Sequence, residues 1–129
     1  LARLSTQERK QVRPLIEANT QEFLVDGTWV AQQLVALNSS DCEATGVAEV
    51  NGETVVVGYG KDSVTRAVYW KRDSVTQQFG DPIRLGGLGG NADAFAKAEG
   101  INSNGQVVGY SGVTISNVST TYAVIWQLP

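Results

Sequence analysis

The amino-acid sequence predicts an all-β protein made of two propeller-like four-stranded repeats of about 50 residues, preceded by a short N-terminal helix. Three observations predict this fold class. The chain of 129 residues has 14 Gly against 3 Pro, with many Val and Thr, which is typical of strands joined by tight turns. Short strand-like runs recur at even spacing along most of the chain, and the sequence contains an internal repeat.

The first element is a helix predicted over residues 5–13, within an N-terminal segment of residues 1–22. Ser5 and Glu8 form a capping box, in which each side chain can accept a hydrogen bond from the other residue's backbone amide. Pro14 would break or kink a longer helix. This end of the chain is also basic, so it is either a solvated helix face or a docking segment for an acidic partner or lipid surface. The candidate docking residues are Arg3, Arg9, Lys10 and Arg13.

Residues 23–129 form the predicted β-repeat domain, with repeat one at about 28–71 and repeat two at about 75–128. The hydrophobic pattern there has the period of strands. The expected strands are 44–50, 54–59, 65–70, 75–79, 94–101, 106–111 and 121–127. Asn51-Gly52 and Asn104-Gly105 predict hairpins with type I′ turns, because both central residues of such a turn need a positive φ.

The two repeats align at a constant offset of 51 residues between 34–59 and 85–110. Seven of these 26 positions are identical: Leu34/Leu85, Leu37/Leu88, Asn51/Asn102, Val56/Val107, Val57/Val108, Gly58/Gly109 and Tyr59/Tyr110. A longer loop then raises the offset to 56, which aligns "AVYW" at 67–70 with "AVIW" at 123–126. The two mid-strand glycines predict close backbone approach. The paired Tyr and Trp residues are expected to fill the space between neighbouring sheets.

The second repeat resembles the HAF repeat, a family of predicted extracellular bacterial repeat proteins. The resemblance rests on a glycine-rich turn (Leu85, Gly86, Leu88, Gly89, Gly90), a strand end (Ala98, Ile101, Asn102), a strand (Gly105 to Tyr110) and a last strand (Ala123, Trp126). The first repeat is degenerate, and the His and Phe that name the family are missing from both repeats. The resemblance covers roughly residues 34–128. It implies an extracytoplasmic, propeller-like module without catalytic activity.

The residue types needed for common catalytic and metal chemistry are scarce. The chain has no His, which excludes Ser-His-Asp and Cys-His catalysis and imidazole metal sites. Cys42 has no basic neighbour to stabilise a thiolate, so an inert thiol is favoured. "LGGLGGNADAF" lacks the Lys of a phosphate loop and precedes a strand, which favours a connecting turn. Acidic pairs such as Asp62 with Asp73, or Asp81 with Asp93, are expected by chance among 13 acids. The sequence therefore predicts a protein that is not an enzyme and uses no metal and no cofactor.

The net charge, the apolar runs and the absence of Met indicate which classes of partner and which cellular location to expect. The net charge of −3 leaves an acidic body beyond the basic end, so nucleic-acid binding is not expected. No apolar run is long enough to span a membrane. The chain contains no Met and begins with Leu1, which predicts a processed, exported product in an extracellular or periplasmic location.

Two function classes remain. In the first, the protein is a structural or assembly subunit, because two blades cannot close a propeller ring and leave strand edges and apolar faces open. Its partners would be other protein subunits or copies of itself. In the second, it is a propeller-type lectin that binds a glycan or small ligand on exposed aromatic rings. The candidate binding residues are Trp29, Tyr69, Trp70, Tyr122 and Trp126, for which burial between sheets is the competing interpretation.

Overall fold

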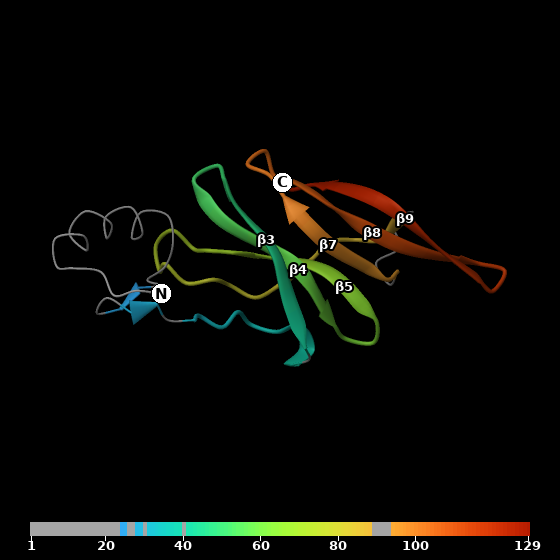
Figure 1. Ribbon diagram of the computed structural model, residues 1–129, viewed down its shortest axis with the longest axis horizontal. Helices are drawn as coiled ribbons and strands as arrows, with labels where there is room; N and C mark the ends of the chain where they lie inside the picture. Colours follow the sequence, from blue (N-terminus) through green and yellow to red (C-terminus); the bar gives the residue numbers. More distant parts are fainter. Residues whose placement is uncertain (1–23, 26–27, 30, 40, 89–93) are drawn as a thin grey trace.

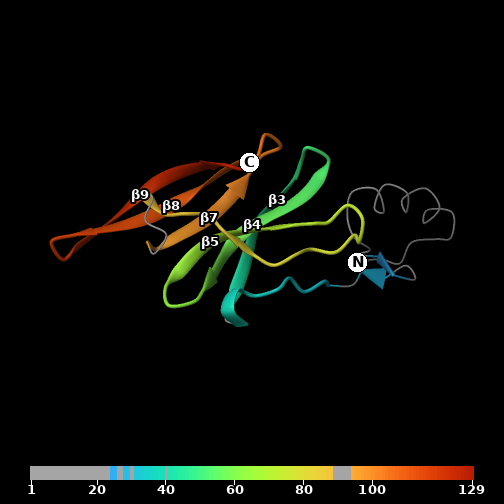
Figure 2. The same ribbon diagram turned by 180° about the vertical axis from the view of Figure 1, so that it is seen from behind.

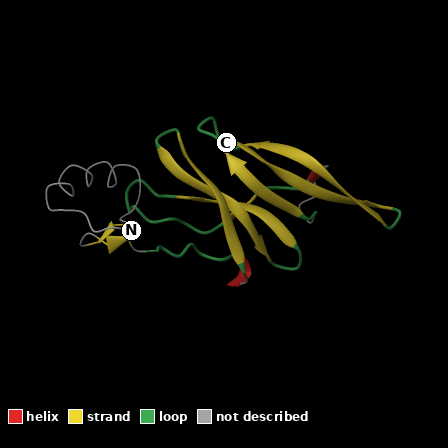
Figure 3. Ribbon diagram, viewed as in Figure 1, coloured by secondary structure: helices red, strands yellow, loops and turns green. Residues whose placement is uncertain are grey.

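The computed structural model describes residues 24–25, 28–29, 31–39, 41–88 and 94–129. Antiparallel strands make up nearly all of its regular structure (Figure 3), which confirms the all-β prediction. The helix predicted over residues 5–13 and the basic residues Arg3, Arg9, Lys10 and Arg13 lie outside the described residues. A two-residue pair, β1 (Leu24–Val25) and β2 (Thr28–Trp29), comes first, and a short 3-10 helix, η1 (Leu37–Ser39), follows.

Two larger sheets form the body of the molecule. The first has the order β3-β4-β5-β6 and the second has the order β7-β8-β9. The first sheet consists of β3 (Cys42–Val50), β4 (Glu53–Lys61), β5 (Thr65–Lys71) and β6 (Ile83–Arg84). The second consists of β7 (Ala96–Ile101), β8 (Gln106–Ile115) and β9 (Val118–Gln127). The sheets therefore do not follow the predicted repeats. Strand β6 lies within the predicted second repeat (about 75–128) but joins the first sheet, and the second sheet has three strands among the described residues.

The two sheets pack face to face, with β7 lying against β3, β4 and β5. Figures 1 and 2 show the sheets from opposite sides, with the hairpin of β8 and β9 extending past the first sheet, away from β1 and β2. The core is made of small and branched apolar side chains from both sheets, closed at one end by Leu128. Its other buried members are Val50, Val55, Val57, Ala67, Ala96, Ala98 and Val107. The described sheets close no propeller ring.

A matching irregularity in each sheet explains the two mid-strand glycines. A bulge lies between Ala44 and Gly46 in β3 and between Ala98 and Gly100 in β7, next to Gly58 and Gly109 on the neighbouring strands. A Cβ on Gly58 would lie 1.8 Å from the carbonyl oxygen of Glu43. No side chain fits at that distance, so the predicted close backbone approach is confirmed.

The bulges also correct the alignment of the repeats. Ala44 pairs with Gly58 and Ala98 pairs with Gly109, so the first strands of the two sheets correspond at an offset of 54, although the second strands keep 51. The hairpin between β7 and β8 is shorter and absorbs the difference. Asn51 and Asn102 match in the sequence but are not equivalent in the structure.

The turn predictions are confirmed in one case and wrong in the other. Asn51 and Gly52 have φ of 51° and 79° and join β3 to β4 directly, as a type I′ turn requires. In the second hairpin only Gly105 has a positive φ, and its amide donates to the carbonyl oxygen of Asn102. The side chain of Asn102 accepts hydrogen bonds from the amides of Asn104 and Gln106, which favours a four-residue turn instead.

Two strand predictions need correction. Residues 75–79 are not a strand, because Asp73 Oδ1 accepts hydrogen bonds from the amides of Val75 (2.7 Å) and Thr76 (2.9 Å) and turns the chain there. The short strand Ile83–Arg84, which lies in the predicted second repeat, pairs with β5 and completes the first sheet. The expected long loop before 121–127 is also wrong, since β8 and β9 continue into it and meet at Ser116 and Asn117.

Candidate docking surface

The second sheet carries an open apolar face on the side away from the first sheet. We call this the outer face and define it by Val108, Tyr110, Ala123 and Ile125. Val108 lies opposite Ile125 and Tyr110 lies opposite Ala123, which places the four side chains on one side of the sheet. Val108 is 49% exposed and Ile125 is 63% exposed. The ring of Tyr110 lies 5.9 Å from the ring of Phe95 at the margin of this face.

The first sheet has a hollow on its side away from the second sheet. This far hollow has a volume of about 450 Å³, and its walls are mostly apolar. Residues that line it include Leu34, Ala44, Val47, Val56 and Phe79. Val47 is 63% exposed although it lies in the middle of β3. Both sheets therefore leave an apolar face without a covering sheet among the described residues, on opposite sides of the molecule.

A pair of tryptophans fixes a connecting segment to each sheet in the same way. Trp70 Nε1 donates a hydrogen bond of 2.8 Å to the carbonyl oxygen of Val35, and Trp126 Nε1 donates one of 2.7 Å to that of Gly86. Trp70 and Trp126 are repeat counterparts, and Val35 and Gly86 are separated by the repeat offset of 51. The segment 31–36 thus approaches the first sheet as residues 82–87 approach the second.

The two connecting segments, residues 82–87 and 31–36, differ in whether they also pair with a β-strand. Ile83 and Arg84 pair with Tyr69 and Val68 of β5, and the amide of Leu85 donates to the carbonyl oxygen of Ala67 over 2.8 Å. Residues 31–36 have no strand partner in the described part of the chain. Strand β9 in turn has no described neighbour on the side where β5 carries β6. In the described part of the chain, an extended segment and a strand edge are therefore left without a strand partner.

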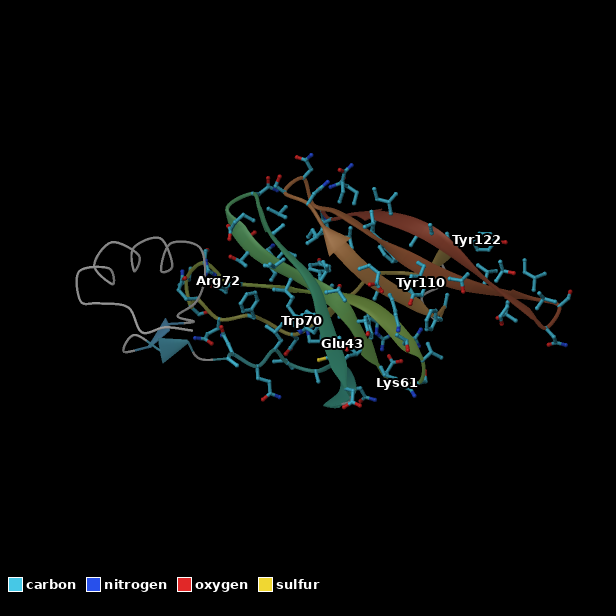
Figure 4. All side chains as sticks on the ribbon, viewed as in Figure 1. Glu43, Lys61, Trp70, Arg72, Tyr110 and Tyr122 are labelled. Carbon is cyan, nitrogen blue, oxygen red and sulfur yellow. The ribbon has the colours of Figure 1, made fainter. Side chains whose placement is uncertain are left out.

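The aromatic residues predicted as a glycan platform form no shared exposed surface among the described residues; Trp70 and Tyr122 lie on different sheets (Figure 4). Trp70 is 0% exposed on the first sheet and offers no ring face to a ligand. Tyr69 and Trp126 pack against the core. Tyr122 is 49% exposed on β9 of the second sheet. Trp29 lies in β2, and its side chain lies outside the described structure. Only Tyr122 among the described candidates presents a substantially open ring.

The carboxylates singled out in the sequence have structural partners. Asp62 follows β4, and its carboxylate contacts Arg66 Nε at 2.9 Å and Arg84 Nη2 at 2.5 Å. Desolvation acts to raise the pKa of Asp62, but the hydrogen bonds from Arg66 and from the amides of Val64 and Ser63, together with the charge of Arg66, lower the pKa from 3.8 to about 2. Arg66 and the backbone amides hold this carboxylate ionised, so it is not a proton donor at neutral pH.

Asp73 serves the turn that follows β5. Its pKa is lowered chiefly by the hydrogen bonds from the amides of Thr76 and Val75, which outweigh the opposing effect of desolvation. Asp62 and Asp73 thus stabilise separate turns. Asp81 is exposed, and Asp93 lies outside the described residues.

Other kinds of site find little support in the described part of the chain. Cys42, at the start of β3, is a partly buried free thiol. No group of three or more Cys, Asp and Glu side chains is placed to hold a metal ion among the described residues. None of the described helices is long and apolar enough to cross a membrane.

The sequence predicts open apolar faces and strand edges, but it does not identify the residues of the outer face or the segment at 31–36. Of the four outer-face residues, only Tyr110 belongs to a repeat pair that was expected to lie between sheets. Comparison of the chain with protein-family models, with curated proteins and with solved structures finds no match.

Proposed function

We propose that this protein is a non-enzymatic structural or assembly subunit that acts through contacts of its sheet faces and strand edges with other protein subunits. One observation carries the proposal: the described part of the chain stacks one sheet on another and leaves an apolar face open at each end of the stack. Val108 and Ile125 on the outer face and Val47 beside the far hollow are all about half exposed or more. Contiguous apolar patches on a protein surface mark sites of interaction.

The free strand edge supports the same role. An unpaired edge presents a row of amide and carbonyl groups that can pair with another chain, and natural proteins cover or charge such edges. The β9 side chains on the outer-face side of the second sheet are mainly Thr, Ser, Ala and Ile, and the strand contains no Lys, Arg, Asp or Glu. An uncharged edge next to an apolar face is suited to a partner that adds a strand and stacks a sheet.

A role outside the cytoplasm belongs to the same proposal. It is supported by the resemblance of residues 34–128 to predicted extracellular repeat proteins. The assignment as a non-enzyme is supported by the chemistry of the acids, since Asp62 is committed to Arg66 and Arg84 and the chain has no His to act as a base.

The proposal is tested by placing charges on the outer face. The double variant Val108→Asp/Ile125→Asp is compared with wild type and with Val75→Asp, which changes a valine that is 88% exposed in a loop. Sedimentation velocity and affinity capture from the native source are measured with each bait. We expect wild type and the control to associate with protein and the double variant to lose that association, because buried unpaired carboxylates are unfavourable.

Two results would contradict the proposal. One is association that is unchanged by the double variant. The other is specific retention on a glycan array that is abolished by Tyr122→Ala, which would favour the lectin alternative. Circular dichroism and thermal unfolding of each variant show whether the fold is intact.

A further inference from the structure

We propose that the partner is a second copy of this chain, bound head to tail: the outer face of one copy covers the far hollow of the next, and residues 32–34 of that next copy extend the first copy's β9. This inference rests on the proposed function and names the partner. It follows from the contact that the chain already makes between its own two sheets.

The first half of that contact is repeated on the outer face. Residues of the first sheet that face the second are Val57, Tyr59, Ala67 and Tyr69, and their repeat counterparts are Val108, Tyr110, Ala123 and Ile125. Val57 and Ala67 are fully buried by the second sheet, whereas Val108 and Ile125 are open. The outer face is thus a second copy of a surface that is built to receive a sheet.

The second half of the contact is repeated beside the far hollow. Ala98, Ile101 and Val107 pack against the first sheet. Their counterparts, judged by the strand pairing, are Ala44, Val47 and Val56, which line the far hollow. Ala44 and Val47 are exposed, whereas Ala98 and Val107 are fully buried. Among its described residues, one chain therefore carries both halves of a sheet-on-sheet contact, each without a covering sheet, on opposite sides.

Strand pairing at the sheet edges predicts which residues of the two copies lie opposite each other. Ile83, Arg84 and Leu85 pair with β5 before the chain crosses to the second sheet. Their counterparts are Gln32, Gln33 and Leu34, which are already held on the first sheet by the bond between Trp70 and Val35. The counterpart of β5 is β9. Residues 32–34 of one copy are consequently placed to pair with Val124 and Ile125 of another.

The contact between copies is weaker than the contact within a chain. Thr45, the bulge residue of β3, donates a hydrogen bond of 2.7 Å to the carbonyl oxygen of Ala98 and so ties the two sheets together. The bulge residue of β7 is Glu99, whose carboxylate cannot donate such a bond. Association is therefore reversible and depends on concentration. Because the two surfaces differ, copies add as open chains or close as a ring.

Cysteine cross-linking tests the register. The amide of Leu85 donates a hydrogen bond to the carbonyl oxygen of Ala67, so these two residues are a hydrogen-bonded pair. The next pair along the strands, Val68 and Arg84, therefore exchanges no hydrogen bonds. In such pairs the Cα atoms lie about 4.5 Å apart. The counterpart of the Val68–Arg84 pair between copies is Val124 with Gln33. A disulfide fits that distance. Chains carrying only Gln33→Cys are mixed with chains carrying only Val124→Cys, both with Cys42→Ser to remove the native thiol.

We expect disulfide-linked dimer from the mixture and little from either chain alone. Held side by side, the two thiols react at an effective concentration near mM, so at micromolar protein the mixture should exceed either single variant at least about tenfold. Replacing Val124→Cys by Thr121→Cys, which shifts the thiol three residues along β9, should remove the excess. A chain carrying both Gln33→Cys and Val124→Cys should give a ladder of oligomers or one closed ring.

The outcomes separate this inference from the proposed function. Equal dimer from the single variants would mean a symmetric contact, which overturns the head-to-tail arrangement. Absence of excess dimer in the mixture overturns it too, and the proposed function then stands if the outer-face double variant still abolishes capture of a different protein. If that capture is also unchanged, both proposals fall.

Discussion

At the scale of single residues, the fold depends on positions where no other side chain fits. Gly58 and Gly109 sit beside the bulges of β3 and β7, and the neighbouring carbonyl oxygens of Glu43 and Lys97 occupy the space of a Cβ. Bulges bend a strand, and the bulge residue of β3, Thr45, donates a hydrogen bond to the carbonyl oxygen of Ala98 on the facing sheet. Each glycine is thus required by the local path of the strand next to it.

The variant Gly109→Ala tests this requirement. Its Cβ would lie 1.9 Å from the carbonyl oxygen of Lys97, a backbone atom that cannot move aside alone. We expect a loss of unfolding free energy of about 1–3 kcal/mol or more, as for other overpacked sites. Urea unfolding measures it. Gly112→Ala on the same strand is the control, since its nearest neighbour is Phe95 Cδ1 at 3.6 Å. Equal effects of the two variants would contradict this account.

The two tryptophans predict a graded effect. Trp70 is fully buried and Trp126 only partly, although both donate to a backbone carbonyl of a connecting segment. We expect Trp70→Ala to lower the unfolding free energy by about 3–5 kcal/mol. Trp126→Ala should lower it by less, because less buried apolar surface is lost and water can enter the partly exposed space left by the Trp126 ring. Thermal or urea unfolding of both variants measures the order. A larger loss for Trp126→Ala would show that the partly exposed ring carries more of the core.

At the scale of elements, a charge cluster fastens β6 to the rest of the first sheet. Arg84 lies on β6, Arg66 lies on β5, and Asp62 begins the turn between β4 and β5. Strand β6 is only two residues long. This charge cluster and the hydrogen bond from the Leu85 amide to the carbonyl oxygen of Ala67 therefore hold it in place. The pKa of Asp62, lowered from 3.8 to about 2, means that the folded state favours the ionised carboxylate.

That shift predicts an acid-sensitive contribution to stability. A group whose pKa is lower in the folded state stabilises the fold fully above its unfolded pKa of 3.8 and loses the effect as pH falls toward 2. We expect wild type to lose stability between about pH 4 and pH 2 more steeply than Asp62→Asn, which is the less stable protein at pH 7. Urea midpoints across this range measure both. Asp81→Asn, at an exposed position, should follow the wild-type profile.

The elements also show where local sequence is a sufficient guide. Asn51-Gly52 forms the turn that its residues favour, because both must adopt a positive φ that Asn and Gly tolerate. Residues 75–79 have a strand-like composition but follow Asp73, whose side chain captures two backbone amides and makes a turn. A side chain that competes for backbone hydrogen bonds overrides a weak strand propensity. These hydrogen bonds span only two and three residues, so the signal for this turn is also local.

At the scale of the whole molecule, two stacked sheets with unlike outer surfaces define a direction. The far hollow lies at one end of the stack and the outer face at the other, and the repeat makes each surface resemble one half of the internal contact. A repeat array that buries its sheets only against neighbours leaves its terminal surfaces open unless they are capped. The described residues contain no cap of polar side chains over Val108 and Ile125.

The sequence by itself determined the all-β class, the repeat, the glycines and tryptophans that recur in it, and the turn at Asn51-Gly52. These properties depend on local sterics and on a pattern of period two, which neighbouring residues carry. Tertiary structure alone decided the three-residue shift of β3 against β7, the pairing of Ile83 and Arg84 with β5, and the faces that each sheet buries or leaves open. Those depend on hydrogen bonds and packing between residues far apart in the chain, where a bulge or a shortened hairpin changes which side chains meet.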